Sequence, residues 1–159
     1  MSRLIIIRGN SGSGKTTVAQ AVHRQLPGSL LIDQDVVRRD MLGASDKPGN
    51  PSIALMAAIA RFGLARNQTV ILEGILVKKV YGTMLSELAA AFDAVQAYYY
   101  DLTLEETLRR HQTRHRASFG PAELERWFIP HDVLGWPQEE MIAPTWTAAQ
   151  AAVHIVTAE

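Results

Sequence analysis

The feature that most constrains this chain is a glycine-rich turn near its start, Gly9-Asn10-Ser11-Gly12-Ser13-Gly14-Lys15-Thr16. The turn fits the pattern G-x-x-x-x-G-K-[ST] in every specified position. It follows the apolar run Leu4 to Ile7, and apolar residues recur at helical spacing from Lys15 to Leu26. A strand, a glycine turn and a helix in this order bring backbone N–H groups and a helix N-terminus together around phosphate oxygens. The turn therefore predicts a nucleotide phosphate site.

The residues of this turn have separate expected tasks. Glycine is needed at positions 9, 12 and 14, because a side chain there would force a disallowed φ or fill the space of the phosphate. Lys15 supplies a positive charge for the β- and γ-phosphates, and Thr16 supplies a hydroxyl for Mg²⁺. A dinucleotide fingerprint does not fit, because Thr17 stands where its third glycine should be. The expected nucleotide-binding residues are Gly9, Asn10, Ser11, Gly12, Ser13, Gly14, Lys15, Thr16 and Thr17.

The rest of the chain alternates between strand-like and helix-like segments. The expected strands are residues 4–7, 30–32, 70–72, 94–100 and 141–143, and the expected helices are 15–26, 36–42, 52–66, 81–92, 103–114 and 147–157. Thr103 and Glu106 form a capping-box pattern at one of these helix starts. Such alternation predicts an α/β fold with a parallel sheet covered by helices on both faces, because each parallel crossover needs a helix-length connection.

Length and composition limit the possible functions. A chain of 159 residues forms one domain at roughly 100–200 residues per domain, so we expect a single domain over residues 1–159. It has no cysteine, which excludes disulfides and thiolate metal sites. Lys+Arg and Asp+Glu are equal at 16 each, so nucleic acid is an unlikely partner. The apolar runs are too short for a membrane span or a signal peptide, so we expect a cytoplasmic protein without a membrane partner. The oligomeric state stays open.

Three acidic residues follow expected strands, where parallel sheets place their ligand sites. Asp33 and Asp35 follow the second strand, and Glu73 follows the third. Along an extended exit, residues 33 and 35 point the same way, so two carboxylates would face one cleft. Phosphoryl transfer to an alcohol needs a carboxylate as base and acids near Mg²⁺. The alternatives are an N-cap role for Asp35, a turn role for Asp33 and a solvated strand end for Glu73.

An interrupted segment with several Gly and Pro residues, residues 114–138, is the candidate for a mobile flap. Arg110 and Arg114, four residues apart, share one helix face just before it. Arginine suits phosphate because its fork meets two oxygens. The alternative for this pair is a solvated basic face at a helix C-terminus. The spacing of His111 and His115 is compatible with a metal, but no acid accompanies them and arginines surround them. Tyr98, Tyr99 and Tyr100 are expected to pack in the core rather than build a site.

Four segments together resemble the P-loop kinases of small hydroxyl substrates: Gly9–Thr16, Asp33–Arg38, Val70–Glu73 and Thr107–Arg114. This group includes shikimate and gluconate kinases, chloramphenicol phosphotransferase and polynucleotide 5′-hydroxyl kinases. The resemblance implies a three-layer αβα P-loop NTPase fold, a five-stranded parallel sheet of order 2-3-1-4-5, a lid at about residues 110–138, and ATP with Mg²⁺.

The resemblance also implies roles for individual residues. Asp35 with Arg38 is similar to the D-x-x-R of polynucleotide kinases, in which the Asp is the base and the Arg steadies the reacting groups. Asp33 is similar to the first Asp of the D-x-D of shikimate kinases, near the metal. In these relatives, cations at the place of Arg110 and Arg114 close over the nucleotide. Glu73 departs from the more usual Asp, which leaves three roles open for it: holding Mg²⁺ through water, contacting the acceptor, or serving as the base instead of Asp35.

The sequence thus predicts an ATP-dependent kinase that phosphorylates a hydroxyl of a small soluble acceptor, such as a nucleoside, a sugar acid or an antibiotic-like compound. The expected catalytic residues are Lys15, Asp35, Arg38, Arg110 and Arg114, and the expected metal-binding residues are Thr16, Asp33 and Glu73. The candidates for the acceptor pocket are Arg38, Arg39, Arg61, Lys78, Lys79, Trp127, His131, Asp132 and Trp136.

Two other functions compete with this prediction. A nucleotide-hydrolysing switch of the GTPase type would need Asn-Lys-x-Asp, which is absent, and D-x-x-G occurs only at Asp40–Gly43 inside an expected helix. A polynucleotide 5′-hydroxyl kinase activity is compatible with net neutrality only if a single terminal nucleotide is recognised.

Overall fold

A sheet of five parallel strands forms the centre of the molecule. The computed structural model describes residues 1–66, 68–113 and 119–158. The strands are β1 (Arg3–Gly9), β2 (Leu30–Asp33), β3 (Thr69–Gly74), β4 (Ala94–Tyr100) and β5 (Glu139–Met141). Their order is β2-β3-β1-β4-β5, and each neighbouring pair is parallel. The fold class and strand order predicted from the sequence are confirmed.

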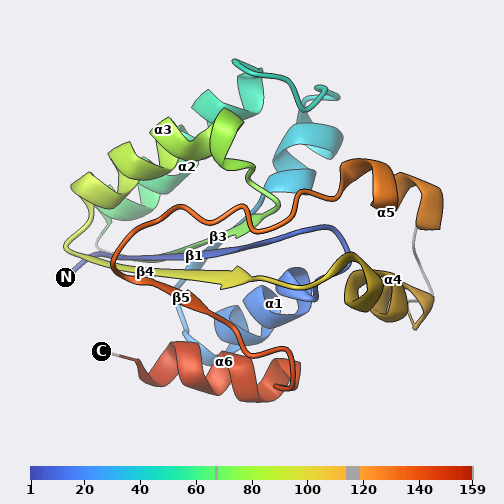
Figure 1. Cartoon of the computed structure of the whole chain (residues 1–159). Helices are drawn as coiled ribbons and strands as arrows, with labels where there is room; N and C mark the ends of the chain where they lie inside the picture. Colours follow the sequence, from blue (N-terminus) through green and yellow to red (C-terminus); the bar gives the residue numbers. More distant parts are fainter. Residues whose placement is uncertain (67, 114–118, 159) are drawn as a thin grey trace.

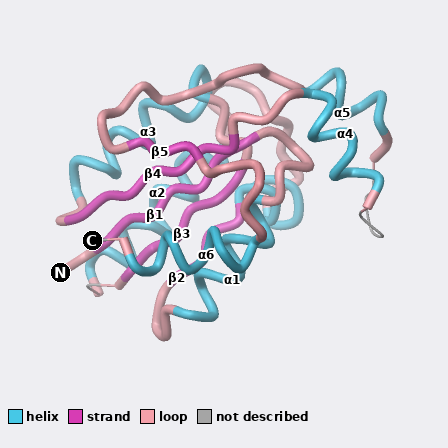
Figure 2. Tube along the Cα trace, turned by 60° about the horizontal axis from the view of Figure 1, so that its bottom comes forward, coloured by secondary structure: helices cyan, strands magenta, loops and turns pink. Residues whose placement is uncertain are grey.

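Helices cover both faces of this sheet. On one face lie α2 (Pro51–Ala65) and α3 (Lys78–Ala91), and on the other lie α1 (Lys15–Gln25) and α6 (Ala148–Thr157) (Figure 1). A π-helix, η1 (Val36–Met41), connects β2 toward α2. Two further helices, α4 (Leu104–Gln112) and α5 (Pro121–Trp127), lie together at the end of the molecule opposite the termini (Figures 1 and 2). This is the end at which β1 and β4 finish.

The central strand β1 explains why the chain forms three layers. Its residues from Leu4 to Ile7 are 0 % exposed. Leu4 and Ile6 pack with the core under α2 and α3, whereas Ile5 and Ile7 pack with the core over α1 and α6. Successive side chains of a strand point to opposite faces, so an uninterrupted apolar run is needed where both faces are buried.

Several boundaries differ from the prediction. The last strand spans residues 139–141 rather than 141–143, and Ile142 N donates to Tyr99 O at 2.9 Å just beyond it. The acidic start of this strand does not look like a buried strand in the sequence. Helix α3 begins at Lys78 rather than at the predicted Tyr81. The segment predicted as a helix over residues 36–42 forms the π-helix η1.

The segment from 114 to 138 contains a helix that the sequence reading missed. Helix α5 begins with Pro121 after Gly120, and the Glu123 carboxylate accepts a hydrogen bond from Gly120 N at 2.9 Å. Proline in the first turn and an acid at the third position are helix-start signals, but here they were interpreted as interruptions. Helix α4 ends at Gln112, and the predicted end at Arg114 lies outside the described residues.

The described part of the chain contains no helix of sufficient length and apolar character to cross a bilayer.

Candidate active site

The glycine-rich turn joins β1 to α1 at the carboxyl end of the sheet. Gly12 and Gly14 have φ values of 84° and 97°, which only glycine adopts without strain. Gly9 is required for another reason, because a Cβ there would lie 2.8 Å from Ser13 Oγ and 2.9 Å from Tyr100 Cβ. The expectation that glycine is needed at these positions therefore holds, although at position 9 the crowding partner is protein.

A cavity of about 380 Å³ opens beside this turn. Gly12, Gly14 and Lys15 form the part of its lining that belongs to the turn, and Lys15 Nζ donates to Asn10 O at 3.2 Å. The remaining lining residues come from α1, the end of β4, α4 and the segment before α6: Thr16, Thr17, Val18, Tyr100, Arg109, Arg110, Thr113, Pro144, Trp146 and Ala148. The cavity thus combines a phosphate-type turn with aromatic and cationic groups, which suit a nucleobase and its phosphates.

Arg110, for which the sequence predicts a contact with the nucleotide, lines this cavity. Its Nη1 donates to Ser13 O at 2.6 Å, its Nε donates to Glu106 at 2.9 Å, and its guanidinium lies 5.8 Å from the centre of the Tyr100 ring. Hydrogen bonds from Arg109 and Arg110 lower the pKa of Glu106 to about 2. Glu106 therefore holds Arg110 beside the turn as a permanent carboxylate. The other predicted arginine, Arg114, lies outside the described residues.

Glu73, at the end of β3, lies against the start of α1. Thr16 Oγ1 donates to Glu73 Oε1 at 2.9 Å, and Glu73 is opposite Asp33 in the register of β3 and β2. Burial raises the pKa of Glu73 to about 8, and the nearby Asp33 carboxylate adds to the rise while Lys15 opposes it. The structure thus brings together the residues that the sequence predicted to hold a metal.

The donors around Glu73 fit Mg²⁺. Hydroxyl and carboxylate oxygens are the hard ligands that Mg²⁺ prefers, and Mg²⁺ is usually held by one or two carboxylates together with substrate phosphates. Within residues 1–66, 68–113 and 119–158, no group of three or more His, Cys, Asp and Glu side chains is placed to hold a metal ion by itself. Thr16, Asp33 and Glu73 therefore suit an ion that is shared with a nucleotide.

Asp33 and Asp35 do not share one face of an extended segment, so this part of the sequence interpretation is wrong. Asp35 has helical dihedrals, φ −67° and ψ −37°, and the chain turns immediately after β2. Asp33 Oδ1 accepts from the N–H groups of Asp35 and Val36 at 2.8 and 3.2 Å. Asp33 therefore has the turn role, and Asp35 occupies the N-cap position of η1 without a side-chain cap bond.

The Asp35 side chain turns instead toward the arginines that follow it. It is 58 % exposed, and its Oδ1 lies 3.4 Å from Arg38 Nη2 and 3.7 Å from Arg39 Nε. The predicted pair of Asp35 and Arg38 is thus formed. Because Asp35 keeps most of its surface, its carboxylate stays open to a second molecule.

A second cavity, of about 580 Å³, also borders the turn, through Ser11. Its lining joins η1 and the loop after it to the start of α3 and the end of α5: Ser11, Asp35, Arg38, Arg39, Ser45, Asp46, Ile75, Val77, Val80, Arg126, Trp127 and Ile129. Of the acceptor-pocket candidates, Arg38, Arg39 and Trp127 line this cavity. The others do not: for example, Arg61 faces Glu87 at 4.0 Å, His131 pairs with Asp101 at 2.6 Å, and Trp136 packs on the core.

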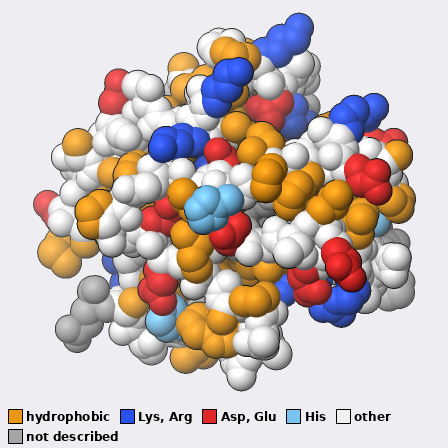
Figure 3. Space-filling model, in the orientation of Figure 1, with side chains coloured by type: hydrophobic (Ala, Val, Ile, Leu, Met, Phe, Trp, Pro, Cys, Tyr) orange, Lys and Arg blue, Asp and Glu red, His pale blue; other side chains and the backbone are white. Residues whose placement is uncertain are grey.

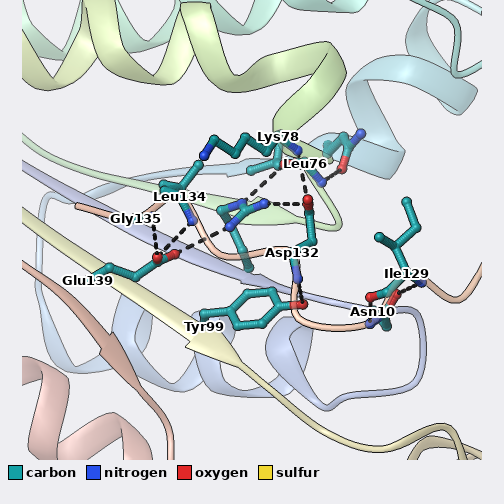
Figure 4. Close-up of polar contacts among 11 residues, drawn as sticks. Asn10, Leu76, Lys78, Tyr99, Ile129, Asp132, Leu134, Gly135 and Glu139 are labelled. Atoms are coloured by element: carbon teal, nitrogen blue, oxygen red, sulfur yellow. Dashed lines mark hydrogen bonds and ion pairs between the residues drawn. The ribbon is translucent and has the colours of Figure 1, made fainter.

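A buried cation in β1 anchors the segment that follows α5, and the sequence reading missed it (Figure 4). Arg8 is 0 % exposed; its Nη2 lies 2.7 Å from Asp132 Oδ2, its Nη1 lies 3.3 Å from Glu139 Oε1, and its Nε donates to Leu76 O at 3.1 Å. An arginine inside an otherwise apolar central strand is the signal that called for a buried partner.

The same segment is bound to the glycine-rich turn itself. Asn10 Nδ2 donates to Ile129 O, and Ile129 N donates to Asn10 Oδ1, both at 2.8 Å (Figure 4). Asp132 N donates to the Tyr99 hydroxyl at 2.9 Å. Tyr99 and Tyr100 are buried as expected, but Tyr100 also lines the first cavity, which the expectation of a pure core role did not include.

The surface adds a constraint on large anionic partners. On the face shown in Figure 3, basic, acidic and hydrophobic side chains are interspersed, and neither charge sign covers the face continuously. Among the residues coloured there, this face therefore presents no continuous basic surface to a long anionic partner.

Comparisons with known proteins agree with this geometry at the level of fold. A gluconokinase from Sinorhizobium meliloti 1021 superposes with a TM-score of 0.68 at 18% identity, over 96% of this chain and 90% of that one. A sugar kinase from a Janibacter species gives 0.69 at 18% identity, over 99% and 94%. The APS kinase of Mycobacterium tuberculosis, solved with AMPPNP and APS, gives 0.66 at 16% identity, over 98% and 95%.

The sequence comparisons are narrower. No curated protein matches the chain. A family model described as an AAA domain matches residues 4–127, which include the glycine-rich turn, Glu73 and helices α1 to α4. The resemblance to P-loop proteins that the sequence motifs indicated is thereby confirmed, and the chain belongs to the AAA domain family.

Proposed function

We propose that this chain is an ATP-dependent kinase that transfers the γ-phosphoryl group to a hydroxyl of a small soluble acceptor. The observation that carries the proposal is that two cavities border the same glycine-rich turn. Gly12, Gly14 and Lys15 line the first cavity, and Ser11 lines the second. A donor in the first cavity and an acceptor in the second would meet at the turn, as direct transfer requires.

The first cavity supplies the groups that bind and neutralise the donor. The turn and the N-terminus of α1 present N–H groups to the phosphates, and Lys15 and Arg110 add positive charge. Thr16 and Glu73, with Asp33 beside them, would hold Mg²⁺, which would neutralise part of the phosphate charge. Kinase catalysis depends mainly on such positioning and charge.

The second cavity supplies the base. Asp35 lines it, is largely exposed and is held near Arg38. Glu73 is buried and already bonded to Thr16, which favours the metal role for Glu73 and the base role for Asp35. In the transfer, the acceptor oxygen forms a bond to the γ-phosphorus, the bond from that phosphorus to the bridging oxygen breaks, ADP leaves, and the hydroxyl proton passes to Asp35.

The test is a transfer assay. The protein is incubated with Mg²⁺-ATP and panels of nucleosides, sugars, hydroxy acids and hydroxylated antibiotics, and each acceptor is examined for the mass gain of about 80 daltons that one phosphoryl group adds. We expect a gain for at least one class together with equal formation of ADP. Phosphate release that ignores every acceptor would instead indicate a nucleotide-hydrolysing switch.

The polynucleotide alternative is tested in the same assay. A 5′-hydroxyl oligonucleotide is added as an acceptor at several salt concentrations. Phosphorylation whose affinity falls steeply with salt would favour this alternative, because contacts to many phosphates release counterions.

A further inference from the structure

The second cavity, in which we propose that the acceptor binds, is called the acceptor cavity below. Part of its lining is cationic and has no role in the chemistry proposed so far. Arg39 comes from η1 and Arg126 comes from α5, and both line the cavity. Their guanidinium carbons lie 5.9 Å from the centre of the same ring, that of Trp127. Two segments far apart in the sequence thus bring two permanent positive charges to one aromatic ring.

A third arginine in this cavity is buried with an unused donor. Arg38 is 9 % exposed; its Nη1 donates to Ala44 O at 2.9 Å, and its Nη2 lies 3.4 Å from Asp35. Its Nε is buried and has no hydrogen-bond partner among the described residues. Arg38 thus adds a third positive charge to the lining of this cavity.

The acids of the cavity do not neutralise these cations. Among the described residues, the lining contains three arginines, Arg38, Arg39 and Arg126, and two acids, Asp35 and Asp46. Asp46 accepts a hydrogen bond from the Tyr81 hydroxyl, and Asp35 lies 3.7 Å from Arg39, which is a loose contact at an exposed site. The cavity therefore keeps an excess of positive charge.

The lining also contains apolar side chains, those of Ile75, Val77, Val80 and Ile129. A cavity lined by arginines, apolar side chains and one exposed carboxylate fits a molecule that carries an anionic group, a carbon skeleton and a hydroxyl.

We propose that the acceptor is a hydroxylated organic anion, whose carboxylate, sulfate or phosphate group binds Arg39 and Arg126 beside Trp127 while its hydroxyl faces Asp35. This inference rests on the proposed kinase function and names the substrate class for it. Arginine guanidinium groups bind such oxyanions with paired hydrogen bonds. An anion bound by both Arg39 and Arg126 would also link η1 to α5.

The first experiment compares matched acceptors in the Mg²⁺-ATP assay. The pairs are gluconate with glucitol, and a nucleoside 3′-monophosphate with its nucleoside. We expect at least one anionic member to exceed its neutral partner by about tenfold or more in kcat/KM, mainly through KM. Turnover of the neutral partners with equal or greater kcat/KM would overturn the inference.

The second step uses the arginine variants. The double variant Arg39→Gln, Arg126→Gln should raise KM for the anionic acceptor by about tenfold or more with a smaller change in kcat, because the anion contact exists before and during transfer. The matched control is Arg61→Gln on α2, which lies outside both cavities and should leave KM unchanged. An equal loss of kcat/KM for anionic and neutral acceptors would contradict anion recognition.

A binding measurement separates failure of this inference from failure of the kinase proposal. The protein is saturated with Mg²⁺-ADP, so that the phosphate turn is filled, and is titrated with inorganic sulfate while tryptophan fluorescence is followed. We expect a saturable change in the parent protein, with about tenfold or greater weakening in the double variant. Sulfate binding of this kind without any transfer would reject the kinase and retain the anion site. An absent or unaltered sulfate response would reject the anion site.

Discussion

The two cavities of this protein are built in different ways. The first cavity is the proposed nucleotide cavity. The residues proposed to bind its phosphates are neighbours in the chain and come from one turn and one helix start, between Gly12 and Val18. The acceptor cavity collects Ser11, the η1 residues, the start of α3 and the end of α5, which are separated by tens of residues in the chain. The first is therefore a local motif, and the second exists only when the fold is complete.

This difference teaches where specificity is located. Phosphate recognition uses backbone N–H groups, whose geometry is set by glycine and the helix start, so one motif suffices for any chain of this kind. In the proposed function, acceptor recognition would use side chains from three elements. Their identities can vary while the sheet and the turn stay the same, so the acceptor must be inferred from this cavity and not from the turn.

The largest expected effect comes from removing the proposed base, which lies in the acceptor cavity. Asp35→Asn should lower turnover by about 10²–10⁴, because an amide cannot accept the acceptor's proton. The affinity for nucleotide should not change, since Asp35 lines only the acceptor cavity. Single-turnover kinetics and nucleotide titration measure the two quantities. Full activity in this variant would reject Asp35 as the base and would favour Glu73 in that role.

A smaller loss is expected on the nucleotide side. Lys15→Met should lower turnover by about 10²–10³, the range found when one charge-stabilising donor is removed from a transition state. Unlike Asp35→Asn, it should also weaken nucleotide binding, because Lys15 lines the nucleotide cavity. Circular dichroism would verify that the variant is folded. Unchanged turnover and binding would show that the turn does not hold the transferred phosphate.

The buried ion pairs of Arg8, which anchor the segment after α5, should contribute to the stability of the protein. Arg8→Gln leaves the carboxylates of Asp132 and Glu139 without their buried partner, and should lower the free energy of unfolding by about 3–5 kcal/mol in urea denaturation. The exposed pair of Arg61 and Glu87 provides the control, because Arg61→Gln should change it by less than about 1 kcal/mol. Equal effects of the two variants would mean that Arg8 does not anchor the segment after α5.

The smallest expected effect concerns protons at Glu73. Its pKa of about 8 means that the carboxyl is mostly protonated at pH 7 before ligands bind. Binding of Mg²⁺ requires the carboxylate, so Mg²⁺-nucleotide binding should release a proton, and affinity should rise by at most about tenfold per pH unit and level off above pH 8. Calorimetry in buffers of different ionisation enthalpy measures the release. Glu73→Gln should abolish it; a release that persists in this variant would assign the proton to another group.

The sequence predicted the fold more completely than the site. The glycine turn, the alternation of elements and the resemblance together predicted the strand order, because these features are local or come from a motif. The conformation of Asp35 was not predictable, since an exit from a strand can be extended or helical. The partners of Arg8 were not predictable either, because Asp132 and Glu139 lie 124 and 131 residues away in the chain.

The acceptor cavity shows the same limit. Arg38, Arg39 and Trp127 were among its candidates, but so were Arg61 and His131, which lie elsewhere. The composition of a segment does not reveal which of its cations will face a common space. Arg126 is not among the predicted candidates, because the sequence predicts an interrupted flap at residues 114–138. In the structure, Arg126 lies on helix α5, the end of which lines the cavity.

The most direct test of the account is a crystal structure with Mg²⁺ and a non-hydrolysable ATP analogue. We expect the phosphates to lie within residues 9–16, the metal to lie by Thr16 and Glu73, and the nucleobase to lie toward Tyr100 and Trp146. The terminal phosphate should then face the cavity that contains Asp35. A nucleotide that left the turn empty, or placed its phosphates among Arg38, Arg39 and Arg126, would contradict the account.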